Sequence, residues 1–254
     1  MSTGKGIALV TGAAQGIGQA IALQLANDGF DVALNDVPSK KSQLDAVAQM
    51  VNATGHNALV VCADVSIEED VVAMIKAAVE VLGGLDVMVA NAGISGSPSP
   101  LVDTLKLGDK LFAINARGVY LCYKHAAKQM IAQGRGGRII GASSAAGKRA
   151  FPLNAIYCAS KFAVRGLTQS AASELGKYGI TVNSYAPGII DTPMLQALDG
   201  QGDKDAIAAA VAATPTSYMG KPEDIAGIVS YLASKEAHFI TGQSFSVDGG
   251  MILS

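Results

Sequence analysis

The stretch Thr11-Gly-Ala-Ala-Gln-Gly-Ile-Gly18 decides the fold, because it joins an apolar strand to a helix through a glycine-rich turn. Residues 7–10 before it are apolar, and the apolar positions of residues 17–27 recur at helical spacing. Glycines let a backbone approach a ligand closely, and a helix amino terminus offers N–H groups to phosphate. The GxxxGxG spacing differs from the common GxGxxG and lacks the Gly-Lys-Ser/Thr ending of nucleotide-hydrolysing loops. The turn therefore predicts a dinucleotide site.

Short apolar runs and longer helical patterns alternate along most of the chain. Strands are predicted at residues 7–10, 32–34, 58–62, 85–89, 138–141, 181–185 and 245–247. Helices are predicted at residues 17–27, 41–52, 67–82 and 157 to about 175. Continuous apolar strands separated by helices imply parallel crossover connections. We therefore expect an α/β fold: a single-domain, Rossmann-type, doubly wound parallel sheet of about seven strands with helices on both faces, covering residues 1–254.

Residues 191–220 break this alternation. The segment is rich in alanine, is interrupted by Gly200, Gly202 and Pro215, and shows no strand pattern. It follows the sixth predicted strand, at the carboxyl edge of the sheet, where ligands bind in such folds. We expect a lid over the substrate, because loops at that edge commonly close over reactants. The alternative is an ordinary pair of surface helices.

The composition argues against several classes of partner. The formal net charge of -2 lacks the basic stripe that nucleic acid requires. No signal peptide is visible, and the longest wholly apolar run, residues 206–213, is too short to span a bilayer. The cysteines and histidines stand apart from one another, without metal-ligand spacing: Cys62, Cys122, Cys158, His56, His125 and His238. We expect no metal site, no membrane or nucleic-acid partner, and a cytoplasmic protein with reduced thiols.

Asp36 points to the identity of the cofactor. It ends the second predicted strand, a little more than twenty residues after Gly12. A carboxylate at this position accepts hydrogen bonds from both ribose hydroxyls and repels a 2′-phosphate. No basic side chain stands at Ala14, Gln15 or Val37 to bind such a phosphate. These residues favour NAD over NADP, the alternative being a solvated aspartate at a strand end.

Polar or small residues also follow the third and fourth predicted strands. Asp64-Val65 places a carboxylate where an adenine amino group can donate to it. Asn91-Ala92-Gly93 offers small residues that allow the cofactor to approach. Taken alone, each segment is equally compatible with a loop cap.

Tyr157 and Lys161 are the candidates for proton transfer. Their i, i+4 spacing on a predicted helix puts them on one face, one turn apart. At about 4 Å and an effective dielectric near 20, the attraction between ammonium and phenolate is roughly 4 kcal/mol, or about three pKa units. We therefore expect the pKa of Tyr157 to lie near neutrality, where a general acid/base works well.

Three further polar residues accompany this pair. Ser143 and Ser144 follow the fifth predicted strand, where a hydroxyl can donate to a substrate carbonyl oxygen. Asn115 lies before the Arg117-Gly118 break between two helical patterns and has no evident packing role. Each of these residues is also compatible with an ordinary cap or turn.

The ordered set of TGAAQGIG, Asp64, NAG, Asn115, Ser144, YxxxK and Pro187-Gly188 resembles the short-chain dehydrogenase/reductase family over essentially the whole chain. The resemblance implies a catalytic tetrad of Asn115, Ser144, Tyr157 and Lys161, with Ser144 preferred because it lies thirteen residues before Tyr157. In the family, Tyr transfers the proton, Ser orients the substrate oxygen, Lys lowers the Tyr pKa and binds the nicotinamide ribose, and Asn holds a water linking Lys to solvent. One small departure is Ala90, where the family often has asparagine.

The resemblance also implies which residues bind the cofactor. Residues 187–192 are expected to line the nicotinamide, with Ile190 and Thr192 contacting its carboxamide. The full predicted set is Gly12, Gln15, Gly16, Ile17, Gly18, Asp36, Asp64, Val65, Asn91, Ala92, Gly93, Tyr157, Lys161, Pro187, Gly188, Ile190, Thr192 and Met194. Members of the family tend to form homotetramers through the long helix after Tyr157 and the carboxyl-terminal segment.

The finer sequence pattern bears on the substrate. Residues 160–169, 185–189, 192–194, 241–244 and 248–251 resemble acetoin (diacetyl) reductases and 2,3-butanediol dehydrogenases, which use NAD. This favours a small hydroxyketone or vicinal diol, with a bulkier cyclic, aryl or 3-oxoacyl ketone as the alternative. Ala145, Ala146, Phe151, Asn154 and the lid are the candidate pocket residues. The rival from a different class is a catalytically silent NAD-sensing binding protein.

Overall fold

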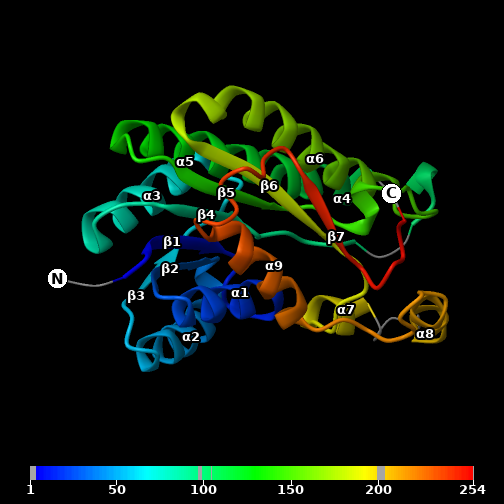
Figure 1. Cartoon of the computed structure of the whole chain (residues 1–254). Helices are drawn as coiled ribbons and strands as arrows, with labels where there is room; N and C mark the ends of the chain where they lie inside the picture. Colours follow the sequence, from blue (N-terminus) through cyan, green and yellow to red (C-terminus); the bar gives the residue numbers. More distant parts are fainter. Residues whose placement is uncertain (1–3, 97–98, 104, 199–203, 254) are drawn as a thin grey trace.

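The computed structural model describes residues 4–96, 99–103, 105–198 and 204–253. Its centre is one sheet of seven strands in the order β3-β2-β1-β4-β5-β6-β7, and every neighbouring pair is parallel (Figure 1). The strands are β1 (Gly6–Thr11), β2 (Phe30–Asp36), β3 (Ala58–Cys62), β4 (Val87–Ala90), β5 (Gly137–Ala142), β6 (Ile180–Pro187) and β7 (Ser244–Val247). The predicted doubly wound parallel α/β sheet is confirmed.

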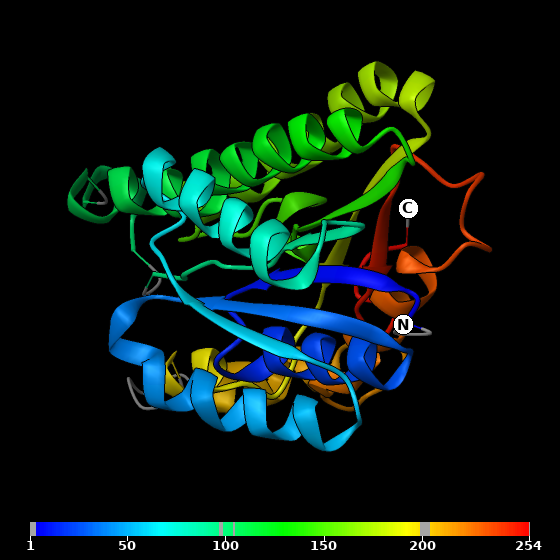
Figure 2. The ribbon, with the colours of Figure 1, turned by 90° about the vertical axis from the view of Figure 1, so that its left-hand side faces the viewer.

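Helices cover both faces of this sheet. One face packs against α1 (Gly16–Asn27), α2 (Lys41–Ala53) and α9 (Pro222–Ala233), and the other against α3 (Glu68–Leu82), α5 (Val119–Gln133) and α6 (Ala155–Leu175). Figure 2 shows the two helical layers with the sheet between them. Strand residues alternate between two apolar clusters, so Val10 belongs to the first and Leu9 to the second. Burial on both faces explains why the strands read as continuous apolar runs. No helix among the described residues is long and apolar enough to cross a membrane.

The fourth strand differs from its predicted range of residues 85–89. Leu85 is buried, but its N–H donates to Oε1 of Gln133 on α5 (2.9 Å) and not to a neighbouring strand. Pairing with β5 begins at Val87 and reaches Ala90. The apolar run therefore locates the strand. Pairing with the neighbouring strand starts only at Val87, after the Leu85 N–H has bonded to the Gln133 side chain.

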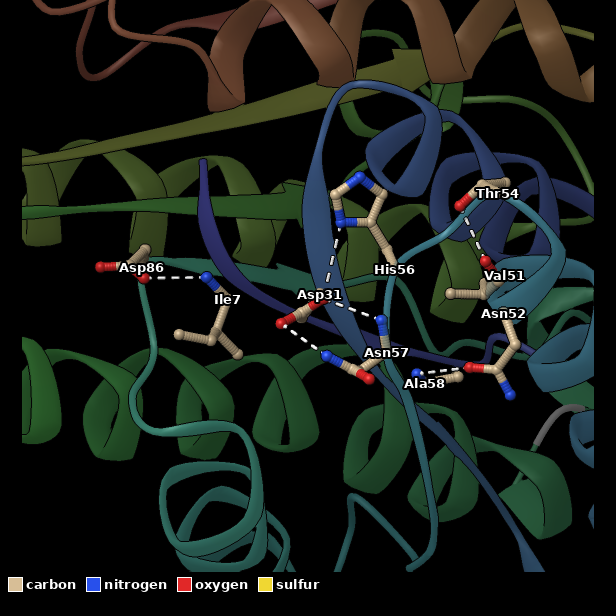
Figure 3. Close-up of polar contacts among 9 residues, drawn as sticks. All are labelled: Ile7, Asp31, Val51, Asn52, Thr54, His56, Asn57, Ala58 and Asp86. Atoms are coloured by element: carbon tan, nitrogen blue, oxygen red, sulfur yellow. Dashed lines mark hydrogen bonds and ion pairs between the residues drawn. The ribbon is translucent and has the colours of Figure 1, made fainter. Parts of the chain in front are cut away.

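Polar side chains bind one another at the amino ends of the strands, the edge opposite the glycine turn (Figure 3). Asp31 on β2 accepts the backbone N–H of Asn57 through Oδ1 (2.8 Å) and its side-chain amide through Oδ2 (3.2 Å). His56 Nδ1 lies 3.6 Å from the same carboxylate. Asp86 accepts the N–H of Ile7 (2.8 Å), which ties the start of β1 to the segment before β4. These contacts tie the amino ends of neighbouring strands to one another.

Residues 113–118 do not form the expected break between two helical patterns. A π-helical turn (Ala113–Gly118) links α4 (Leu105–Phe112) directly to α5. Gly118 fits against Val65 because it has no Cβ, which would lie only 2.9 Å from Val65 Cγ2. Such π-turns are frequent at functional sites. Short 3₁₀ turns occur at Pro38–Lys40, Leu101–Asp103, Ala145–Gly147 and Gly176–Tyr178.

The predicted lid, residues 191–220, contains two short helices, α7 (Pro193–Leu198) and α8 (Lys204–Ala212). Gly200 and Gly202 lie outside the described residues. The ends of the segment meet beside β6, where the Asp191 N–H donates to Gly220 O (2.9 Å) and the Gly220 N–H donates to Ile189 O (3.0 Å). This joint includes an isolated parallel bridge between Ile190 and Gly220. The segment therefore leaves and re-enters the fold at one point.

Candidate active site

A cavity of about 920 Å³ opens at the carboxyl ends of the strands. Its lining runs from the turn after β1, past the ends of the central strands and the start of α6, to α7 and α8. Every residue predicted to bind the cofactor contributes to this lining, and so does Ser144. Of the predicted tetrad, Asn115 alone does not line the cavity. The cavity lies where ligands bind in open parallel sheets.

The glycine turn has the geometry of a phosphate cradle. Gly12 and Gly16 adopt positive φ angles of 65° and 56°, which disfavour residues with a Cβ. A Cβ on Gly18 would lie 2.1 Å from the carbonyl oxygen of Gly12, so only glycine permits this contact between helix and strand. Gln15 precedes α1 without capping it through its side chain. The first N–H groups of α1 thus meet the turn at the positive end of a helix dipole, a site suited to a pyrophosphate.

Asn91 supports this turn from the end of β4. Its Nδ2 donates to Thr11 O (2.8 Å) and Gly12 O (3.2 Å), while Tyr185 donates its hydroxyl to Asn91 Oδ1 (2.8 Å). Thr11 Oγ1 accepts the N–H groups of Asn91 and Ala92, each at 3.0 Å. Asn91 therefore contributes to the cavity mainly by fixing the backbone of the glycine turn. The supporting role of Tyr185 had no signal in the sequence, because it joins strands far apart in the chain.

Two carboxylates line the cavity just after β2 and β3. Asp36, at the end of β2, accepts the Ala14 N–H through Oδ2 (3.2 Å) and the Val37 N–H through Oδ1 (2.8 Å). These bonds hold the half-buried carboxylate beside the glycine turn. Asp64, after β3, uses Oδ1 to accept both the N–H (2.8 Å) and the hydroxyl (2.7 Å) of Ser66. Both carboxylates line the cavity, where a carboxylate can accept hydrogen bonds from the ribose hydroxyls of a bound dinucleotide.

Tyr157 and Ser144 meet at the inner end of the cavity. Tyr157 lies in the first turn of α6, and Ser144 caps the short turn at Ala145–Gly147, where its Oγ accepts the N–H of Ala146 (3.1 Å). Ser143 Oγ instead donates to the carbonyl of Lys161 (3.0 Å), on the backbone of α6. Ser143 and Ser144 both line the cavity, and Ser144 is the serine whose hydroxyl acts to lower the pKa of Tyr157. The geometry supports the preference for Ser144 over Ser143.

The predicted pKa of Tyr157 is wrong for the chain alone. Burial raises the pKa of Tyr157 above its ordinary 10, although the hydrogen bond with Ser144 acts in the opposite direction. Lys161 is 4% exposed, and its Nζ lies 5.8 Å from the centre of the Tyr157 ring and donates to Ala142 O (2.9 Å). Burial lowers the pKa of Lys161 to about 8. The expected direct attraction therefore gives way to desolvation of both groups.

Asn115 acts through other groups. It is fully buried in the π-helical turn, and its Oδ1 accepts the Ile94 N–H (2.9 Å) while Nδ2 donates to Ile94 O (2.9 Å) and Ser160 Oγ (3.3 Å). Ser160 Oγ in turn donates to the carbonyl of Tyr157 (2.7 Å). Gly93 leaves room for this arrangement, because a Cβ there would lie 3.2 Å from Asn115 Oδ1. The Asn115 side chain therefore ties the loop after β4 to the start of α6.

Three predicted pocket residues lie outside the cavity lining. Ala145 and Ala146 are buried in the turn that Ser144 caps, and Phe151 is not part of the lining either, whereas Asn154 contributes to it. The predicted lid contributes Ala206, Ile207 and Ala210 to the lining, which also includes the unpredicted residues Ile94, Lys110, Pro152 and Leu153. Lys40 also lines the cavity without having been predicted. It follows Asp36 by four residues, and only a local turn returns it to the site.

Comparisons with known proteins identify the family. The family model described as enoyl-(acyl carrier protein) reductase matches residues 12–252. A short-chain dehydrogenase/reductase of Hericium erinaceus is 52% identical, and the alignment covers 98% of each chain. This chain belongs to the short-chain dehydrogenase/reductase family. An L-2,3-butanediol dehydrogenase of Corynebacterium glutamicum is 38% identical over 97% of this chain and 98% of that protein. A 3-oxoacyl-(acyl-carrier-protein) reductase of Staphylococcus aureus is 42% identical over the same shares.

Solved structures agree with this assignment. Levodione reductase superposes with a TM-score of 0.92 at 35% identity, covering 97% of each chain. Acetoin dehydrogenase from Salmonella typhimurium superposes with a TM-score of 0.86 at 36% identity, covering 96% of this chain and 95% of that one. The chain is therefore an oxidoreductase of a family that uses NAD(P), and its relatives are consistent with a small-molecule substrate. The glycine turn and the first turn of α1, which Gln15 does not cap through its side chain, fit such a dinucleotide.

Proposed function

We propose that this chain is an NAD(H)-dependent oxidoreductase that interconverts a secondary alcohol and a ketone, with a small hydroxyketone or vicinal diol as substrate. One observation carries the proposal. The Ser144 and Tyr157 hydroxyls share a cavity with the glycine turn, which brings proton transfer and nucleotide binding within reach of one substrate. Proximity of this kind turns a reaction between separate molecules into one within a complex.

The nicotinamide, when bound, supplies or accepts the hydride. In the reduction direction, Tyr157 gives its phenolic proton to the carbonyl oxygen that becomes the alcohol, and in oxidation it takes that proton back. Ser144, whose Oγ is oriented by the Ala146 N–H, donates a hydrogen bond to the same oxygen. Lys161, whose Nζ lies near the Tyr157 ring, stays protonated at neutral pH because its pKa is about 8. We assign Asn115 to positioning, through Ser160 and the Tyr157 carbonyl.

NAD is the proposed cofactor. Asp36 offers a half-buried carboxylate at the adenosine end of the cavity, where it accepts ribose hydroxyls and repels a 2′-phosphate. The remaining predicted contacts, from Gly12 to Met194, keep the roles given by the family resemblance. Their place in the lining supports that assignment.

The choice of a small substrate rests on relatives. The butanediol dehydrogenase and the acetoin dehydrogenase named above support a hydroxyketone or diol. The 3-oxoacyl reductase favours a second candidate, a bulkier ketone or 3-oxoacyl thioester. We also propose that residues 1–254 form one NAD-binding domain, that residues 191–220 close over the substrate, and that four copies assemble. A cytoplasmic location stays a prediction from the cysteine pattern.

A panel of ketones tests the proposal. The loss of NADH absorbance is followed with diacetyl, acetoin, a cyclic diketone, an aryl ketone and a 3-oxoacyl thioester, and alcohol oxidation is followed with 2,3-butanediol and NAD⁺. We expect the highest kcat/KM for diacetyl or acetoin. A higher kcat/KM for the thioester or the aryl ketone would select the second candidate. Tight NADH binding without turnover of any compound would instead support a nucleotide-sensing protein.

A further inference from the structure

The π-helical turn Ala113–Gly118 contacts the segment after β3 through two neighbouring residues. The Arg117 guanidinium donates through Nη1 to the carbonyl oxygen of Ser66. Gly118 packs against Val65, where an added Cβ would lie 3.2 Å from the Val65 carbonyl oxygen. The turn therefore holds the backbone of this segment at two successive residues.

The segment held in this way, residues 63–66, contributes a carboxylate to the cavity. Residues 63–65 line the cavity, and Asp64 Oδ1 accepts both the N–H (2.8 Å) and the hydroxyl (2.7 Å) of Ser66. The Asp64 N–H donates to Asp70 Oδ2 (2.9 Å) in the first turn of α3. Because Ser66 orients the Asp64 carboxylate, a donor that fixes the Ser66 carbonyl also fixes the direction of that carboxylate.

The Arg117 guanidinium is not engaged by an acidic side chain. Among the residues that the structure describes, Arg117 takes part in no ion pair. The nearby Glu68 carboxylate pairs instead with Lys124 (2.6 Å) and His125 (2.8 Å) of α5. These two contacts tie the start of α3 to α5 without Arg117. The helix packing therefore does not depend on Arg117, whose side chain binds the backbone of the cavity segment.

The same turn also reaches the catalytic end of the cavity. Asn115, two residues before Arg117, binds the N–H and the carbonyl of Ile94 (2.9 Å each) and the hydroxyl of Ser160 (3.3 Å). Ser160 in turn binds the Tyr157 carbonyl (2.7 Å). Because one short turn makes both sets of contacts, the segment after β3 is fixed relative to the loop after β4 and the start of α6.

We propose that Arg117 is a positioning residue for the cofactor, holding residues 64–66 so that the Asp64 carboxylate faces the adenosine half of the dinucleotide. This inference rests on the proposed nicotinamide function. Arg117 does not line the cavity, so it acts through the backbone of Ser66. Without this donor the segment gains conformational freedom, and nucleotide binding must order it again. That cost falls on ligands that contain the adenosine half and spares ligands that lack it.

Titration of the full chain with three ligands tests this assignment without any carbonyl substrate. NADH and reduced nicotinamide mononucleotide, which lacks the adenosine half, are followed by their fluorescence, and ADP-ribose is followed by displacement of NADH. The proteins are wild type, Arg117→Met and Arg135→Met. Arg135 is the matched control, because this exposed arginine donates to Asp86 Oδ1 (2.7 Å) at the opposite edge of the sheet.

We expect Arg117→Met to weaken NADH and ADP-ribose binding by about three- to tenfold each. This is less than the loss of a buried charge-assisted hydrogen bond, because Arg117 is exposed. Binding of the reduced mononucleotide should stay within about twofold of wild type. Arg135→Met should leave all three affinities within the same limit.

Three results would overturn the inference. The first is an unchanged affinity of Arg117→Met for NADH and ADP-ribose. The second is an equal loss for all three ligands, which indicates a general disturbance of the fold. The third is the same selective loss in Arg135→Met. Each of these leaves the proposed function standing, because NADH still binds the wild type, whereas a wild type that binds no NADH would overturn both.

Discussion

The two ends of the cavity use ionisable side chains in different ways. At the catalytic end, Lys161 is buried and Tyr157 is half-buried, and desolvation moves their pKa values away from the ordinary ones, upward for Tyr157 and to about 8 for Lys161. At the adenosine end, Asp36 and Lys40 are half-buried and face the open cavity. Desolvation controls protonation at the first end, whereas we propose that the sign of a half-buried charge selects ligands at the second. Changes at the catalytic end should therefore alter chemistry, and changes at the adenosine end should alter binding.

The largest effect is expected for Tyr157→Phe. The change removes the proton donor and keeps the ring, so kcat for ketone reduction should fall by about 10³- to 10⁴-fold. NADH binding, measured by fluorescence titration, should stay within about twofold of wild type.

Ser144→Ala provides a graded comparison for the same end of the cavity. Loss of one donor to the developing oxyanion should lower kcat by about 10²- to 10³-fold. A loss in Tyr157→Phe no greater than the loss in Ser144→Ala would contradict the assignment of proton transfer to Tyr157.

A smaller effect, on stability, is expected for Lys161→Met. The folded-state pKa of Lys161, about 8, lies below its ordinary 10.5, so the folded chain holds an unfavourable buried ammonium below pH 8. Unfolding takes up a proton between those values, and the contribution of this lysine to stability therefore improves as the pH rises. At pH 7, Lys161→Met should raise the free energy of unfolding by about 1–2 kcal/mol. Removing the unfavourable buried ammonium contributes roughly 3 kcal/mol, and leaving the Ala142 carbonyl without its hydrogen-bond donor offsets part of that gain.

Chemical denaturation at pH 7 and pH 10 measures this difference. The advantage of Lys161→Met over wild type should shrink toward pH 10, while activity is lost at both pH values. Lys128→Met, a change at an exposed lysine of α5, is the control and should show no such pH-dependent gain. An advantage for Lys161→Met that grows with pH would contradict burial as the cause of the shift.

The smallest effect is expected for Asp36→Asn with NADH as the cofactor. Replacing a charged acceptor by a neutral one should raise the KM for NADH by about three- to tenfold. The kcat at saturating NADH should not change, because Asp36 touches no reacting atom. Asp45→Asn on the exposed face of α2 serves as the matched control. A fall in kcat for Asp36→Asn would remove the distinction between the two ends.

The sequence predicted most of what its local patterns encode. The positions of the strands followed from apolar runs between helices, the turn at Gly12–Gly18 from its glycines, and the Tyr157–Lys161 pair from helical spacing. Such features are local, so a single segment carries the whole signal. The four helices predicted with bounds, α1, α2, α3 and α6, were located to within about two residues, whereas α4, α5, α7, α8 and α9 carried no predicted bounds.

The features that the sequence did not predict depend on segments far apart in the chain. The pKa of Tyr157 follows from desolvation by the surrounding fold. Lys40 differs from the other cases, because it reaches the cavity through a local 3₁₀ turn. Tyr185 supports the glycine turn across three strands through Asn91. Burial and long-range hydrogen bonds are properties of the assembled fold, so no spacing rule shows them.

An ultraviolet difference titration of wild type against Tyr157→Phe, with and without NAD⁺, tests the central claim most directly. The difference isolates the phenolate of Tyr157 from the other six of the seven tyrosines. Without the cofactor, Tyr157 should stay a phenol beyond pH 10, because burial raises its pKa. With NAD⁺ bound, the nearby positive charge should lower that pKa by at least about one unit. Ionisation near neutrality without the cofactor, or a titration that NAD⁺ leaves unchanged, would contradict the account.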